Sequence, residues 1–161
     1  MRNLKLLFLI PSFAIVGCTD LSTNPTKVNK IIYVVGDNKE SVVIIDLDER
    51  TAKHEYMTVY RCAVNIDPNI QACGDGSKHP SSVNAAFTTL SKESFLESIK
   101  DCGLYEMENS YLLPGESELW SITINYINGN TKKSVGNSNA PKSTIWDFKE
   151  AIRTLTGFNN R

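Results

Sequence analysis

The sequence has little of what metal, cofactor and nucleic-acid sites require. Among 161 residues there are two histidines and four cysteines, and none of them forms a C-x-x-C or H-x-x-x-H pair, so we expect no metal site and no cofactor. Lysine and arginine number 17 against 18 acidic residues, so nothing favours a nucleic-acid partner. No internal repeat, low-complexity tract or block of like charges is present. The composition predicts one globular domain.

Catalytic constellations are also missing. Asp46 and Asp48 share one face of a predicted strand, but their spacing alone does not create the separated pKa values that a general acid and base need. Ser77 and His79 lie close together without the strand–turn–helix setting of a nucleophile elbow. We therefore expect a protein that is not an enzyme, with a hydrolase of unrecognised site as the alternative.

The apolar run near the N-terminus is too short to span a membrane as a helix. Leu6–Val16 is free of charge and is broken only by Pro11 and Ser12, whereas a spanning helix needs about 20 apolar residues. Arg2 and Lys5 precede it. A basic start followed by a short apolar centre is typical of an export signal.

The end of this run resembles the lipobox of bacterial lipoproteins. Its residues are Ile15-Val16-Gly17-Cys18: an aliphatic residue, a tolerant position, a small residue and cysteine. The resemblance implies that residues 1–17 are cleaved as a signal peptide, that Cys18 carries diacylglycerol, and that its new amino group is acylated. Two or more acyl chains anchor a protein stably. Thr19, rather than aspartate, follows the cysteine, which implies the outer membrane, with the domain facing the periplasm.

Removal of the signal changes the charge and the cysteine count. Without Arg2 and Lys5 the formal net charge goes from −1 to −3, so lipid rather than charge provides the attachment. Three thiols remain, which allow three single pairings in an oxidising compartment. We favour a disulfide between Cys62 and Cys73, which bracket a loop-forming sequence, with Cys102 as a buried free thiol.

The first half of the mature chain predicts a tether and a meander. Residues 18–29 are polar and are expected to be a flexible tether, and residues 30–161 form the domain. Three strands are predicted over Ile31–Val35, Val42–Ile45 and Ala52–Tyr60, followed by a long loop over Arg61–Ala86. The continuous apolar runs predict strands covered on both faces, or on one face and at an edge.

The second half predicts a helix, a hairpin and a second helix. The first helix is expected to begin after an N-cap at Ser91 and to end at Gly103, with Phe95, Ile99 and Cys102 on its apolar face. Leu119–Val135 alternates as a hairpin, and its Asn128-Gly129 predicts a type I′ turn. The second helix is expected to use Ser143 as its cap and to bury one apolar stripe, ending at Gly157; the stripe is Ile145, Phe148, Ile152 and Leu155.

These elements predict an α+β fold in the order βββ-α-ββ-α. A single, largely antiparallel sheet would carry both helices on one face. The order and the spacing of Trp120, Ile122, Ile124, Asn128-Gly129 and the second helix resemble small α+β domains of uncharacterised bacterial lipoproteins. That resemblance implies no activity and no catalytic residue.

The remaining functional prediction is recognition of a protein partner. Three loops are candidates, namely Asn65–Ser82, Tyr111–Glu118 and Asn130–Lys142, because binding residues concentrate on loops of a rigid scaffold. Within the second loop, Tyr111, Leu112 and Leu113 are the candidate contact residues, and packing on the core is their alternative role. We expect a lipid-anchored envelope protein, for example an inhibitor or immunity-type protein; an accessory lipoprotein in the assembly of an envelope complex is the alternative.

Overall fold

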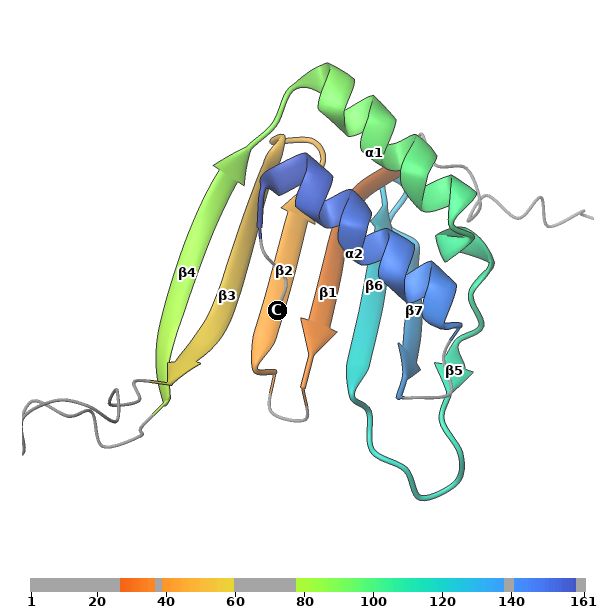
Figure 1. Ribbon diagram of the computed structural model, residues 1–161. Helices are drawn as coiled ribbons and strands as arrows, with labels where there is room; N and C mark the ends of the chain where they lie inside the picture. The colour runs from red at the N-terminus through yellow and green to blue at the C-terminus, as the bar shows by residue number, and fades with distance from the viewer. Residues whose placement is uncertain (1–26, 37–38, 60–77, 138–140, 159–161) are drawn as a thin grey trace, which may run out of the picture.

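The computed structural model describes residues 27–36, 39–59, 78–137 and 141–158 of the chain. These residues form seven strands, two α-helices and a short 3-10 helix (Figure 1). In chain order they are β1 (Val28–Val35), β2 (Ser41–Asp46), β3 (Thr51–Val59), β4 (Lys78–Ala86), α1 (Thr89–Asp101), the 3-10 helix (Leu104–Glu106), β5 (Ser110–Tyr111), β6 (Trp120–Tyr126), β7 (Thr131–Gly136) and α2 (Lys142–Thr156).

All seven strands belong to one sheet, in the order β4-β3-β2-β1-β6-β7-β5. Every neighbouring pair is antiparallel except β5 and β7, which run parallel. The chain therefore builds a meander from β1 to β4, crosses over the sheet as α1, and returns to add β6 beside β1. The predicted class, an α+β fold with one largely antiparallel sheet, is confirmed.

Both helices cover the same face of the sheet (Figure 1). Phe95 and Ile99 of α1 and Phe148 and Ile152 of α2 are buried against the strands, and the ring of Phe148 meets the edge of Tyr33 at 5.4 Å between centroids. On β6 every second side chain is buried, which is the pattern of a strand with one face in the core; those residues are Trp120, Ile122, Ile124 and Tyr126. The predicted placement of two helices on one face is confirmed.

The predicted order of elements is wrong in two places. The segment Lys78–Ala86, assigned to a long loop, is strand β4 and pairs with β3 along its whole length. Residues 110–111 add the short strand β5. The order is therefore ββββ-α-βββ-α. β4 shows no apolar alternation because it is an edge strand and most of its side chains are exposed on both faces.

Local details of the turns and caps also differ from the prediction. α1 begins one turn earlier than expected, because the Thr88 hydroxyl accepts the Ser91 N–H at 3.1 Å and is the N-cap. The cap of α2 is Pro141 rather than Ser143. In the β6–β7 hairpin Gly129 has a φ of +85°, but Asn128 is not among the described residues with positive φ. The connection is a three-residue loop with glycine at its left-handed position, not a type I′ turn.

Candidate functional site

The candidate contact residues of the Tyr111–Glu118 loop point in different directions. The ring of Tyr111 lies 6.1 Å from that of Trp120, and its hydroxyl accepts the Glu108 N–H at 2.8 Å. A Cβ at Gly136 would stand 2.3 Å from the Trp120 ring, so this corner is closely packed. Leu112 is half-buried, whereas 59% of Leu113 is exposed. Only Leu113 of the three therefore presents a large apolar surface to solvent.

Several predicted residues lie outside the described part of the chain. These are Cys18, Cys62 and Cys73, so the lipid anchor and the disulfide stay predictions. The predicted loop Asn65–Ser82 is only partly described, and its last residues belong to β4. Cys102 is a half-buried free thiol whose Sγ donates to the carbonyl of Ile99 at 3.3 Å.

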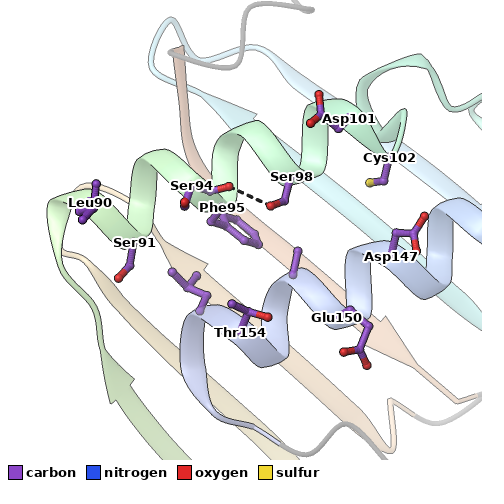
Figure 2. Close-up of a pocket in the computed structure, with 12 residues that line it drawn as sticks. Leu90, Ser91, Ser94, Phe95, Ser98, Asp101, Cys102, Asp147, Glu150 and Thr154 are labelled. Atoms are coloured by element: carbon purple, nitrogen blue, oxygen red, sulfur yellow. Dashed lines mark hydrogen bonds between the residues drawn. The ribbon is translucent and has the colours of Figure 1, made fainter.

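A groove of about 650 Å³ runs between the two helices on the outside of the molecule (Figure 2). Ser91, Ser94 and Ser98 line its α1 side, and the buried ring of Phe95 points from α1 towards α2. The Ser98 hydroxyl donates to the carbonyl of Ser94 at 2.9 Å, so it is occupied within its own helix. The α2 side is lined by Glu150 and Thr154.

The acidic end of this groove disfavours thiol chemistry. Burial raises the pKa of the Cys102 thiol, and the nearby carboxylates of Asp147 and Asp101 raise it further. Reactive cysteines need the opposite surroundings, because a nearby positive charge stabilises the thiolate. No histidine is among the residues that line the groove. The groove therefore offers hydroxyls and carboxylates but no nucleophile–base pair among its lining residues.

The opposite face of the sheet carries an unexpected group of apolar residues, and we name it the aliphatic patch. It consists of Ile32 and Val34 on β1 and Ile44 and Val42 on β2. The register sets Ile32 opposite Ile44 and Val34 opposite Val42, so the four side chains form one cluster at the centre of the sheet. All four are partly exposed, since both helices lie on the other face and no described element covers this one (Figure 1).

The apolar runs were predicted to be covered on both faces, or on one face and at an edge; the edge position is wrong, and the described residues cover one face. β1 and β2 are interior strands, and the described elements cover only one face of them. A strand in that position normally alternates apolar and polar residues, as β6 does with Ser121 and Thr123 on the patch side. The continuous apolar sequence was the available signal, but a single sequence does not tell which face the described helices leave uncovered.

Polar and charged side chains surround the aliphatic patch. Lys30 and Asp46 form an ion pair at 3.0 Å at one end of it. Burial alone would raise the pKa of Asp46, but the N–H of Glu49 and the Lys30 ammonium outweigh it, so the pKa is lowered and the carboxylate stays charged. On the β3 side, Lys53 and Glu55 pair at 2.5 Å, and each lies opposite a patch residue in the register.

Two hollows flank the patch on the side of β4. One, of about 510 Å³, is lined by Ile44, Lys53 and Asn84 together with neighbouring strand residues. The other, of about 460 Å³, includes Val42 and Met57, and 44% of Met57 is exposed. The face is therefore uneven, with an apolar centre and two recesses, rather than a flat solvated sheet.

The single described histidine of the core has a structural role. Only 7% of His54 is exposed; its Nε2 lies 2.8 Å from the Ser41 hydroxyl, and its ring packs on Tyr56 and Phe158. Burial lowers its pKa. Over the described ranges, no group of three or more His, Cys, Asp or Glu side chains is placed to hold a metal ion.

Two further findings concern the length of the described helices and the comparison of the chain with known proteins. None of the helices in the described ranges is long and apolar enough to cross a membrane. No family model matches the chain, and neither the curated proteins nor the solved structures contain a match to it.

Proposed function

We propose that this chain is a lipid-anchored envelope protein that binds a protein partner through the aliphatic patch. The observation that carries the proposal is the apolar composition of the face of β1 and β2 that no described element covers. Four aliphatic side chains at the centre of a solvent-facing sheet are costly unless another surface covers them. The lipobox at residues 15–18 supports the anchor.

The surroundings of the patch support a protein rather than a small molecule as the occupant. Protein interfaces combine an apolar centre with a charged and hydroxyl-bearing rim. Here the rim consists of the Lys30–Asp46 and Lys53–Glu55 pairs on two sides and of Ser121 and Thr123 on the third. Because both signs of charge are present, the expected partner surface is apolar at its centre and carries charges of both signs around it.

Photocrosslinking in cells tests the position of the interface. A photoreactive amino acid at Ile44 is expected to capture the partner, whereas the same group at Trp146 is not, because Trp146 is 65% exposed on α2, which covers the other face. Capture at Trp146 alone, or crosslinks from Ile44 only to residues 60–77 of its own chain, would contradict the proposal. A captured soluble toxin or hydrolase indicates an inhibitor, and a captured membrane component indicates an assembly role.

A charge in the patch is expected to weaken the captured complex. Val34→Asp removes an aliphatic contact and buries a carboxylate without a partner, which costs more than about 1.4 kcal/mol and lowers affinity more than about tenfold. Thr131→Asp is the matched control, because it places the same charge on the same face but on β7, outside the patch and its rim. Quantitative pull-down of the identified partner measures the affinity. An equal loss of affinity in both variants would contradict the assignment of the interface to the patch.

A further inference from the structure

Among the described residues, no strand pairs with the outer edge of β4. The N–H of Phe87 donates to the carbonyl of Arg50 at 3.0 Å, just beyond the last β3–β4 pair. Because backbone groups alternate in direction along an antiparallel strand, Val83 and Ala85 direct theirs at β3. Ser82, Asn84 and Ala86 therefore direct theirs away from the sheet, where no described strand follows β4.

Pro80 occupies a position that is compatible with this alternation. It falls in the outward-directed series, so its missing N–H costs no bond to β3. Natural edge strands are normally protected by charges, bulges or prolines. Pro80 protects one end of β4, but the five residues from Ser82 to Ala86 carry no charge and no proline. This stretch is long enough to accept another strand.

We propose that a second copy of this chain pairs with this edge, β4 against β4, antiparallel and centred on Asn84. Asn84 then lies opposite Asn84 of the second copy, and Ser82 opposite Ala86. Each of these three pairs exchanges two backbone hydrogen bonds, six in all. Centring on Ser82 instead would set Pro80 opposite Asn84 and lose bonds at two of the pairs. Among the registers that keep Pro80 outside the paired stretch, the one centred on Asn84 makes the most backbone hydrogen bonds.

The side chains and the shape of the molecule favour a second copy as the occupant. No like charges meet in this register, since Ser82, Asn84 and Ala86 are neutral and Lys78 lies beyond the paired stretch. Val83, 39% exposed, lies opposite Ala85 of the second copy and gains apolar contact on the helix side of the sheet. α1 leaves β4 over the sheet and away from this edge (Figure 1), so it does not block the approach.

Disulfide trapping tests the register. Residues of a hydrogen-bonded antiparallel pair have Cα atoms about 5.5 Å apart, within the range of a disulfide. With copper–phenanthroline as the oxidant of the two thiols, Asn84→Cys is expected to give a reducible covalent dimer. Ser82→Cys is the matched control, because two residues 82 lie four positions apart in this register. Equal trapping of both variants, or trapping of neither, overturns the proposal.

Charge complementation tests the dimer without a covalent bond. In sedimentation analysis the wild type is expected to have twice the mass of one chain. Asn84→Lys and Asn84→Asp are each expected to have the mass of a single chain, because like charges would meet where residue 84 lies opposite residue 84 of the second copy. A mixture of the two variants is expected to recover the double mass, which also shows that both are folded. A wild type that sediments as a monomer, or variants that stay dimeric, would contradict the proposal. Val34→Asp is expected to leave the dimer intact, so this result does not depend on the proposed function.

Discussion

At the scale of single residues, His54 connects burial to pH dependence. Its ring is enclosed between Tyr56 and Phe158, and burial lowers its pKa. A group whose pKa is lower in the folded state contributes stability that is present above its unfolded pKa of about 6.5 and is lost as the pH falls. The unfolded chain then takes up a proton that the folded core excludes.

Replacing His54 with glutamine is expected to remove this part of the pH dependence. The free energy of unfolding of the wild type should fall more than that of His54→Gln between about pH 7.5 and about pH 5.5, by up to about 1.4 kcal/mol. Urea denaturation at both values measures the difference. His79 is present in both proteins, so any contribution it makes cancels in the difference between them. Parallel losses in the two proteins would show that His54 does not titrate differently on folding.

At the scale of elements, the start of α1 shows how the sequence predicted the right kind of N-cap residue, a hydroxyl side chain, at the wrong position. Thr88 and Ser91 both carry hydroxyls before the apolar stripe, and their oxygens lie 2.9 Å apart. The Thr88 hydroxyl accepts the Ser91 N–H, whereas Ser91 is already inside the helix. Sequence spacing alone did not separate the two, because both satisfy the preference for a hydroxyl at the N-cap.

The two hydroxyl residues are therefore expected to differ in their contribution to stability. Thr88→Ala should cost about 1 kcal/mol, because the Ser91 N–H loses its acceptor at the helix end. Ser91→Ala should cost less than about 0.5 kcal/mol, as is usual for a surface position without such a role. Chemical denaturation of both variants tests this. A larger loss for Ser91→Ala would restore Ser91 as the cap.

The strands show what sequence periodicity predicts and what it does not. β6 was predictable because its alternation of buried and polar residues reports one covered face. β4 was not, because an exposed edge strand has no apolar face to produce a period, and its existence depends on pairing with β3. The continuous runs in β1 and β2 predicted strands correctly, but the cover expected on their second face is absent from the described residues.

At the scale of the whole molecule, the proposed anchor and the two proposed binding surfaces are compatible with one another. Nine residues, 19–27, separate Cys18 from β1, so the start of β1 would lie within about 35 Å of a lipid on Cys18 even at full extension. Pairing through β4 continues the sheet and sets the aliphatic patches of both copies on the same side. If the proposed anchor confines the chain to one membrane surface, the effective concentration of both copies rises, which favours the proposed dimer.

Lipidation is the premise of this arrangement and has a direct test. Cells fed a labelled fatty acid are expected to incorporate the label into the wild-type chain and to keep it in the detergent phase after phase separation. Cys18→Ala should lose the label and move to the aqueous phase, because the thioether and the new amino terminus both require this cysteine. Cys102→Ala is the matched control and should keep the label, since its thiol lies half-buried against α1. Label retained by Cys18→Ala would contradict the lipobox assignment, and with it the proposed location of the partner.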